Sequence, residues 1–266
     1  MPRPPQWTPE IAARFRDPSV VATYHLRLPY PPSIFNALFD LLPDPDLPVL
    51  DLGTGTGEIA RQLAPRVGRV DAVDASPAMI ERLRDMPGGH HRSLHPIVAR
   101  AEDFTPTDPY GLITTGDSLH WMDWDLVLPR FAAWLVPSGF LAIVNRNELP
   151  PPWQDQLKAL VAECSTSRDF ETFDLIAELE RRELFQVVGR FVTPPQPSNP
   201  SVSDYLESFH SRSSLSRDNM TPEAADRFDR HLRELVAPWA VHGHLSLQTV
   251  GSIVWGRPLP GPPRST

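Results

Sequence analysis

The sequence predicts an α/β protein built around a doubly wound, mainly parallel β-sheet. Short apolar runs alternate with segments of helical periodicity over residues 1–145, which is typical of βαβ units. The first run, Val49–Leu52, leads into three glycines at every second position and then into a helical segment, Glu58–Leu63. A glycine turn between a strand and a helix marks the carboxyl edge of a parallel sheet, where such proteins bind ligands.

The expected elements follow from apolar periodicity and from local start and stop signals. Ser33 and Ser76 are suited to cap helices, and Pro77 fits the first position of a helix that the run 87–89 (Pro-Gly-Gly) ends. We expect strands at residues 49–52, 70–73, 96–100, 110–115, 140–145, 185–192 and 245–255. We expect helices at residues 10–25, 33–42, 58–63, 77–86, 125–136, 152–165, 170–182, 202–210 and 222–236.

The alternation of strands and helices breaks after Asn145, where extra helical segments precede the last two strands. We therefore expect residues 1–145 to hold N-terminal helices and the ligand-binding core. Residues 146–256 are expected to supply the closing strands and a helical lid over the carboxyl edge of the sheet, and residues 257–266 a loose tail.

Composition narrows the class of partner. The formal net charge is −8 and no basic cluster stands out, so we expect a small-molecule substrate and no nucleic acid. No apolar stretch reaches membrane-spanning length and the N-terminus lacks a signal-peptide core, so we expect no membrane partner. The single cysteine, Cys164, excludes an internal disulfide and fits a cytoplasmic location. A monomer or a homodimer is expected.

The glycine turn is compatible with three kinds of cofactor loop. A P-loop needs a Lys-Ser/Thr pair after its last glycine, and the sequence has none there. The dinucleotide fingerprint needs a glycine at position 58, which is Glu58. The pattern that remains is an acid followed by alternating glycines: Asp51, Gly53, Gly55 and Gly57. Asp74 ends the next strand, at the place where a carboxylate accepts hydrogen bonds from ribose hydroxyls.

These residues resemble motif I and the second motif (VDAVDASPAMIERLR) of class I S-adenosylmethionine-dependent methyltransferases. The segments ARAEDF, TTGDSLHWMD and FAAWLVPSGFLAIV resemble later motifs of that family. YHLRLPYP is similar to the Tyr-x-x-Arg-Pro-x-Tyr-Pro segment of trans-aconitate-type methyltransferases, with Leu28 in place of the proline. The resemblance implies a Rossmann-like sheet of seven strands with an antiparallel edge strand, and S-adenosyl-L-methionine as cofactor. The cofactor-binding residues it implies are Arg27, Asp51, Gly53, Thr54, Gly55, Gly57, Asp74, Ala75, Ala101, Glu102, Thr115, Gly116 and Asp117. Arg27 is expected to pair with the carboxylate of the cofactor.

Candidate substrate residues lie after the fourth strand and in a basic turn. His120 is a candidate catalytic proton acceptor and Trp121 an aromatic wall beside it, and the alternative is packing under the lid. His210 and Arg212 are candidates for reading an anionic substrate, and the alternative is a solvated loop with helix caps. By analogy with the family, His25 and Tyr30 lie near the entrance and are candidates for substrate contact, and the alternative is that they fasten the N-terminal lid.

We expect no metal site, because the histidines lack fixed spacing and acidic or cysteine partners. The resulting hypothesis is methyl transfer to an oxygen or nitrogen atom of a small metabolite, such as a carboxylate or hydroxyl acceptor of secondary metabolism. Two alternatives stay open. One is a protein of the same fold that binds the cofactor without methylating, as a pericyclase or a regulator does. The other, which Glu58 disfavours, is an NAD-dependent dehydrogenase.

Overall fold

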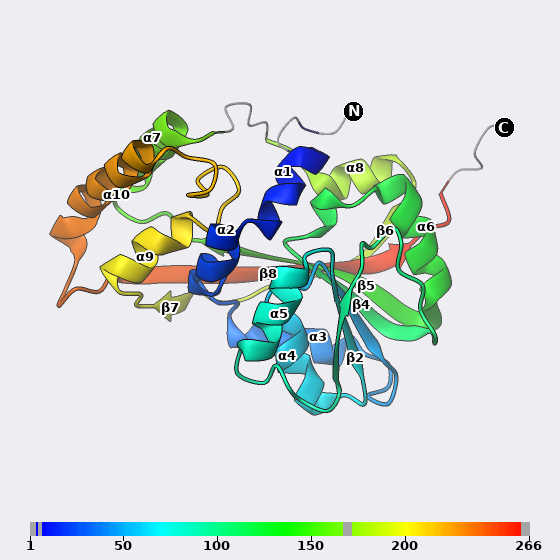
Figure 1. The fold of residues 1–266 in the computed structure, drawn as a ribbon. Helices are drawn as coiled ribbons and strands as arrows, with labels where there is room; N and C mark the ends of the chain where they lie inside the picture. Colours follow the sequence, from blue (N-terminus) through cyan, green and yellow to red (C-terminus); the bar gives the residue numbers. More distant parts are fainter. Residues whose placement is uncertain (1–3, 5–6, 167–171, 262–266) are drawn as a thin grey trace.

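A computed structural model describes residue 4, residues 7–166 and residues 172–261 (Figure 1). A twisted sheet forms the centre of the molecule, with helices on both of its faces and a separate group of helices beyond one end. The strands are β1 (Val49–Leu52), β2 (Val70–Asp74), β3 (Leu94–Val98), β4 (Tyr110–Gly116), β5 (Leu135–Glu148), β6 (Phe185–Val192), β7 (Gln196–Ser198) and β8 (Leu247–Pro258).

The strand order is β3-β2-β1-β4-β5-β8-β6, and the short β7 pairs with β8. Strands β1 to β5 are parallel, and β8 is antiparallel to both β5 and β6. The expected mainly parallel sheet of seven strands is confirmed, and β7 adds an eighth. The antiparallel strand lies one place inside the edge, between β5 and β6, whereas we expected it at the edge. The strand order reverses between β1 and β4, and such a switch opens a crevice at the carboxyl edge of a sheet.

Alternation along the strands directs side chains to two cores. Val49, Val70 and Leu112 pack on the face covered by α3 (Pro32–Asp40), α4 (Glu58–Leu63) and α5 (Pro77–Asp85). Leu50 and Ile113 pack on the opposite face, against α6 (Trp124–Trp134) and α8 (Leu175–Arg181). Ser76 caps α5 by accepting a hydrogen bond from the Met79 amide, as expected.

The prediction of one helix over residues 10–25 is wrong. The segment forms four short pieces: α1 (Pro9–Ala13), η1 (Arg14–Arg16), α2 (Pro18–Thr23) and η2 (Tyr24–Leu26). Asp17 has extended backbone angles (φ −64°, ψ 133°) because it precedes Pro18, and a proline disfavours helical angles at the residue before it. The resulting bend carries the N-terminal segment, residues 7–31, across the carboxyl edge of the sheet (Figure 1).

The helices beyond the sheet form a lid with its own core. This helical lid consists of α7 (Gln154–Cys164), α9 (Val202–Phe209) and α10 (Pro222–Val236), which pack around buried side chains such as Phe209, Phe228 and Leu232. It is assembled from two insertions, one after β5 and one between β7 and β8. Strand β8 continues to Pro258, two residues into the expected tail. Residues 262–266 of that tail lie outside the described part of the chain. Residues 170–171, at the start of the helix expected over 170–182, also lie outside it.

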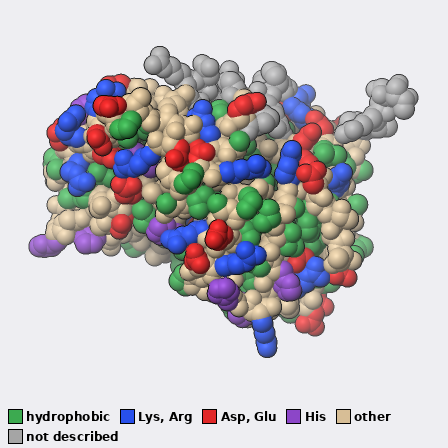
Figure 2. Space-filling model, viewed as in Figure 1, with side chains coloured by type: hydrophobic (Ala, Val, Ile, Leu, Met, Phe, Trp, Pro, Cys, Tyr) green, Lys and Arg blue, Asp and Glu red, His purple; other side chains and the backbone are tan. Residues whose placement is uncertain are grey.

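The surface carries both signs of charge. On the face shown in Figure 2, arginine and lysine side chains are interspersed with aspartate and glutamate, which fits the small excess of acidic residues. Within residues 7–166 and 172–261, no helix has both the length and the apolar character needed to cross a bilayer.

Candidate active site

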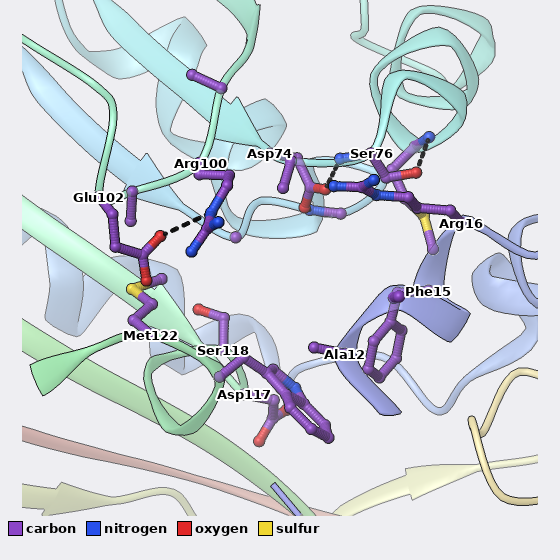
Figure 3. A pocket seen from close by; sticks show the side chains of 18 of the residues that line it. Ala12, Phe15, Arg16, Asp74, Ser76, Arg100, Glu102, Asp117, Ser118 and Met122 are labelled. Atoms are coloured by element: carbon purple, nitrogen blue, oxygen red, sulfur yellow. Dashed lines mark hydrogen bonds and ion pairs between the residues drawn. The ribbon is translucent and has the colours of Figure 1, made fainter. Parts of the chain in front are cut away.

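A cavity of about 570 Å³ opens at the carboxyl edge of the sheet, at the switch between β1 and β4. Ligand pockets for small molecules typically measure roughly 300–1,000 Å³. Its walls come from the turn after β1, the ends of β2 and β4, and the segment after β3, and the N-terminal segment covers it (Figure 3). Lining residues include Ala12, Phe15, Arg16, Tyr24, Gly53, Gly55, Asp74, Ala75, Ser76, Arg100, Ala101, Glu102, Asp117, Ser118, Trp121 and Met122.

The glycine turn forms the floor of this cavity. Gly53 and Gly55 line it, with φ angles of +67° and +54° that side chains other than hydrogen rarely permit. A Cβ atom on Gly53 would lie 2.5 Å from Cβ of Ser118. Gly57 does not line the cavity: it caps the N-terminus of α4, and a Cβ there would lie 2.6 Å from Cδ1 of Leu83. The turn therefore keeps its backbone open to a ligand at two glycines and uses the third for packing.

Asp74 presents an acceptor carboxylate to the cavity. Its Oδ2 accepts a hydrogen bond from the Gly55 amide and its Oδ1 one from the Ser76 amide, both at 2.8 Å. Burial raises the pKa of Asp74, while these hydrogen bonds and the nearby Arg16 guanidinium lower it. Figure 3 shows Arg16 reaching from the N-terminal segment to Asp74. The two amides fix the carboxylate and leave it lone pairs for a ligand.

Asp51 lies beneath the turn and supports it. Its side chain is 2% exposed and accepts hydrogen bonds from Thr54 Oγ1 at 2.6 Å and Thr114 Oγ1 at 2.7 Å. Burial raises the pKa of Asp51 to about 6 against these two hydrogen bonds. Asp51 thus ties the turn to β4, a structural role that the sequence motif alone did not reveal.

A second, smaller cavity of about 20 Å³ adjoins the first and shares Tyr24, Gly53 and Asp117 with it. The Tyr30 hydroxyl donates a hydrogen bond to Oδ2 of Asp117 at 2.8 Å. Arg146 forms an ion pair with Glu58, and its Nε lies 3.8 Å from Oδ2 of Asp117. Glu58, the residue that replaces the last glycine of the dinucleotide fingerprint, also accepts a hydrogen bond from the Tyr30 amide. The N-terminal segment is thereby joined to the start of α4 and to the ends of β4 and β5.

The opposite wall is formed by Ala101 and Glu102. Ala101 is 8% exposed, and Glu102 accepts hydrogen bonds from the Asp123 amide at 2.9 Å and from Nε of Arg100 at 3.3 Å. Of the residues implied by the family resemblance, the large cavity brings together Gly53, Gly55, Asp74, Ala75, Ala101, Glu102 and Asp117. The smaller cavity adds Asp51, Thr54 and Gly116. Thr115 is buried inside the sheet and lines neither cavity.

Arg27 does not line either cavity. Its Nε donates to Ser211 Oγ at 2.9 Å and its Nη2 to the Ser211 carbonyl at 2.6 Å, while the guanidinium stacks on the Tyr24 ring. In this conformation Arg27 ties the N-terminal segment to the turn after α9. Its pairing with a cofactor carboxylate stays a prediction.

The candidate substrate residues divide between the cavity and the lid. Trp121 lines the large cavity, as expected, but the ring of His120 packs between Trp7 and Trp121, at centroid distances of 4.9 and 4.7 Å. This arrangement favours packing over proton transfer for His120. His25 is exposed outside both cavities, and buried Tyr30 holds Asp117.

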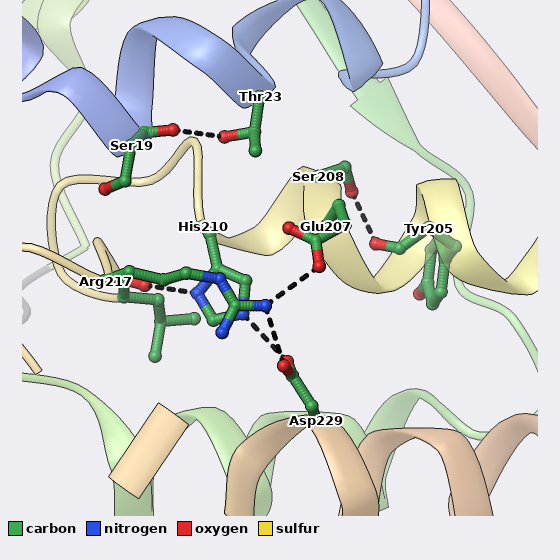
Figure 4. Close-up of polar contacts among 9 residues, drawn as sticks. Ser19, Thr23, Tyr205, Glu207, Ser208, His210, Arg217 and Asp229 are labelled. Carbon is green, nitrogen blue, oxygen red and sulfur yellow. Dashed lines mark hydrogen bonds and ion pairs between the residues drawn. The ribbon is translucent and has the colours of Figure 1, made fainter. Parts of the chain in front are cut away.

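His210 belongs to the core of the lid, which corrects its assignment to substrate binding. The side chain is fully buried, with Nδ1 2.8 Å from the Leu215 carbonyl and Nε2 2.8 Å from Asp229 (Figure 4). Arg217 donates to the same Asp229 and to Glu207. The four side chains lock the turn after α9 onto α10. Arg212, from the same turn, is exposed, and its guanidinium lies 4.3 Å from the Phe209 ring centroid.

The sequence interpretation missed the roof of the cavity and part of its wall. Phe15 and Arg16 follow a short helix that carries no motif, so only the fold places them over Asp74. Ser118 and Met122 flank His120 and Trp121 in the sequence. Their closeness to these two candidates was the one signal that they could line the cavity. No group of three or more metal-ligating side chains forms among the described residues.

Comparison with known proteins agrees with this site. Residues 49–139 match the family model of the methyltransferase domain. Trans-aconitate 2-methyltransferase of Streptomyces avermitilis is 34% identical over 109 residues, which are 37% of this chain and 40% of that protein. The chain thus spans less than half of that relative.

Solved structures show the same fold. A structure described as a type II methyltransferase of Anaeromyxobacter dehalogenans is similar over 88% of this chain and 99% of its own, with a TM-score of 0.61 and 23% identity. A Thiobacillus denitrificans methyltransferase in complex with S-adenosyl-L-homocysteine is similar over 89% of this chain and 97% of its own, with a TM-score of 0.51 and 17% identity. The fold, the cavity and these matches identify residues 49–139 as the core of a class I S-adenosylmethionine-dependent methyltransferase domain.

Proposed function

We propose that this protein transfers a methyl group from S-adenosyl-L-methionine to an oxygen or nitrogen atom of a small-molecule acceptor. The position of Asp74 carries the proposal. Its carboxylate is fixed by two backbone amides at the end of β2, faces the cavity and lies beside the two open glycines of the turn. A carboxylate at this place suits the two hydroxyls of a ribose.

The cavity has a suitable partner for each part of the cofactor. Asp74 is assigned to the ribose, and Ala75, Ala101 and Glu102 to the adenine side. Gly53 and Gly55 allow close approach of the ligand to the backbone. Asp117 and the smaller cavity around Arg146 are assigned to the methionine end. Because Glu58 occupies the start of α4 and is engaged by Tyr30 and Arg146, that helix N-terminus is poorly suited to a pyrophosphate, which disfavours NAD.

When bound, the cofactor supplies an electrophilic methyl group on a positively charged sulfur. The chain contributes position and partial shielding: Ala12, Ala13, Phe15, Arg16 and Trp121 line the cavity and cover part of its opening. Holding the acceptor in line and near contact distance contributes several kcal/mol, up to roughly 7–11 in favourable cases. A carboxylate acceptor carries no proton that must leave, so it needs no general base.

Two observations support a small carboxylate as the acceptor. The relative from Streptomyces avermitilis is named for a carboxylate substrate, trans-aconitate. In this chain, Arg27 and Arg212 place two cations near the turn after α9. The net charge of −8 and the mixed surface disfavour a nucleic-acid partner, and the single cysteine fits a cytoplasmic location.

Calorimetry with S-adenosylmethionine, S-adenosylhomocysteine and NAD tests the cofactor assignment. We expect both sulfur ligands to bind and NAD to bind far more weakly, and tight NAD binding would contradict the proposal. Release of S-adenosylhomocysteine in the presence of a panel of carboxylate, hydroxyl and amine acceptors then tests methylation. Cofactor binding without turnover on any acceptor would favour the non-methylating alternative.

A further inference from the structure

Two polar residues lie side by side at the carboxyl edge of the sheet, beneath the helical lid. Glu148 ends β5 and is the register partner of Thr249, near the start of β8. Arg146, which lines the smaller cavity, precedes Glu148 by two residues, so both side chains point to the same face of the sheet. At about 3.3 Å per residue, Glu148 lies roughly 7 Å beyond Arg146 along β5. Glu148 and Thr249 therefore extend the active site from the methionine end, where Arg146 lies, toward the lid.

Both residues carry a buried oxygen atom that lacks a hydrogen-bond partner within the described part of the chain: Oε1 of Glu148 and Oγ1 of Thr249. Thr249 is only 2% exposed. Buried polar atoms are nearly always hydrogen-bonded in proteins, and leaving one unpaired destabilises the fold. Burial also raises the pKa of Glu148, an effect that Arg212 and the Tyr205 hydroxyl partly offset. Two adjacent unpaired oxygens thus point to a ligand that supplies their partners.

The lid brings a cation, Arg212, near Glu148. Arg212 has an exposed side chain whose guanidinium lies 4.3 Å from the Phe209 ring centroid, and desolvation lowers its pKa. Arg27 lies near enough to lower the pKa of Arg212 further, and Glu148 and Tyr205 act in the opposite direction. Arg27 is held by Ser211, the residue before Arg212, so the turn keeps the two guanidiniums together.

Tyr205 completes the group from α9. It is 2% exposed, and its hydroxyl oxygen lies 3.3 Å from Nε1 of Trp153, which can only donate. The hydroxyl of Tyr205 therefore donates to the carboxylate of Glu148, whose pKa it lowers. Strands β5 and β8, α9 and the turn after α9 thus contribute donors, acceptors and a cation around Glu148.

We propose that Arg212, Glu148, Thr249 and Tyr205 form an acceptor subsite for a small carboxylate that carries a hydroxyl or amino group. The inference rests on the proposed methyltransferase function and specifies its substrate class. Arg212 binds a carboxylate of the acceptor through a charge-assisted hydrogen bond. Oε1 of Glu148 accepts a hydrogen bond from the hydroxyl or amino group, and Thr249 exchanges one with the same group. An acid without that group would leave Oε1 of Glu148 unpaired and would place its own carboxylate charge near that oxygen.

Matched pairs of acids test the subsite. L-malate differs from succinate, and citrate from tricarballylate, by one hydroxyl group. Each acid is titrated by calorimetry into the protein with and without saturating S-adenosylhomocysteine. We expect the hydroxyl-bearing member of at least one pair to bind about tenfold more tightly than its partner. Arg212→Gln should weaken both members about tenfold or more, and Glu148→Met should remove the preference for the hydroxyl.

Arg233→Gln is the matched control, because Arg233 is an exposed arginine of α10 in the same lid, and it should leave all four affinities unchanged. Should Glu148→Met fail to fold, as judged by circular dichroism, Thr249→Val and Tyr205→Phe replace it and should lower the affinity for the hydroxyl-bearing acid severalfold. The inference is overturned if no acid binds, if neither pair shows the preference, or if Arg212→Gln binds like wild type. If S-adenosylhomocysteine binds to wild type in those experiments, only the acceptor subsite is overturned and the proposed function stands. If S-adenosylhomocysteine does not bind to wild type, the proposed function is overturned. The titrations of the acids without S-adenosylhomocysteine then still decide the subsite.

Discussion

The hydroxyl of Tyr30 donates a 2.8 Å hydrogen bond to Oδ2 of Asp117 and so joins the N-terminal segment to the end of β4. Asp117 has a φ angle of +48°, a left-handed conformation that is uncommon outside glycine and is enriched at functional sites. Its carboxylate lines both cavities, and Arg146 approaches the same oxygen from β5. Tyr30 is therefore a positioning residue for Asp117.

The first prediction concerns Tyr30→Phe. Loss of the hydroxyl leaves Asp117 less fixed, so the affinity for S-adenosylhomocysteine should fall about fivefold to tenfold, a change of about 1–1.4 kcal/mol. Tyr110→Phe is the control: its hydroxyl donates to Asp71 at 2.6 Å, away from both cavities, so stability should fall by about 1 kcal/mol with unchanged affinity. Equal affinities for the two variants would contradict a positioning role for Tyr30.

The second prediction concerns Asp74→Ala. The variant loses the acceptor of two ribose hydrogen bonds, so the affinity for S-adenosylhomocysteine should fall by on the order of 2–4 kcal/mol, measured by calorimetry. Asp103→Ala, which removes an exposed carboxylate, should not change the affinity. An unchanged affinity in Asp74→Ala would show that the cofactor does not contact the end of β2.

The third prediction separates two glycines with positive φ angles. Gly53→Ala introduces strain and a contact of 2.5 Å with Ser118, whereas Gly243→Ala meets no atom within 4 Å. Gly243→Ala should lower the free energy of unfolding by about 1 kcal/mol, the usual cost of a left-handed residue. Gly53→Ala should lower it by more and weaken cofactor binding, and adding Ser118→Gly should restore part of both. Equal losses for the two single variants would exclude the close approach as the reason for Gly53.

The parts of the fold that rest on local pattern were predictable. Residues 49–63 combine an apolar strand, a glycine turn and a helix in one stretch, so the floor of the cavity could be read directly. Asp74 followed from its place at the end of the next predicted strand. The boundary of the first helix was misjudged, although Pro18 gave the signal for a break. Strand β7 has three residues, one of them a proline, and forms only because β8 lies beside it.

Long-range contacts explain what the sequence did not reveal at the site. His210 stands in a polar stretch that resembles a solvated loop, and its burial depends on Asp229, nineteen residues later on α10. Arg16 reaches Asp74 only because the N-terminal segment bends over the sheet. Glu148 and Thr249 are about a hundred residues apart in sequence and meet through the pairing of β5 with β8. None of these contacts has a local signature.

The fourth prediction concerns the pH dependence of stability. Burial raises the pKa of Asp51 from 3.8 to about 6, so between these pH values the folded protein holds a proton that the unfolded chain has released. Stability contributed by this group therefore falls as the pH rises from about 4 to 6, by on the order of 3 kcal/mol. Asp51→Asn cannot titrate. The difference in free energy of unfolding between wild type and Asp51→Asn, measured in urea at pH 4 and pH 7, should shift by this amount against the wild type. A difference that is constant with pH would contradict the buried, titrating carboxylate.

The fifth prediction decides the role of His120. Its ring lies between Trp7 and Trp121, so an aromatic ring of similar shape should preserve the packing beside the cavity. We expect His120→Phe to retain turnover within about threefold once an acceptor is known, and His120→Ala to lose stability by leaving a gap between the two indoles. A general base contributes roughly 10²–10⁴-fold to the rate, so its removal would be evident in kcat at any pH. A hundredfold loss of kcat in His120→Phe, with unchanged affinity for S-adenosylhomocysteine, would restore the catalytic interpretation. In that case the ring must leave the stack during turnover, because in the present arrangement it does not line the cavity.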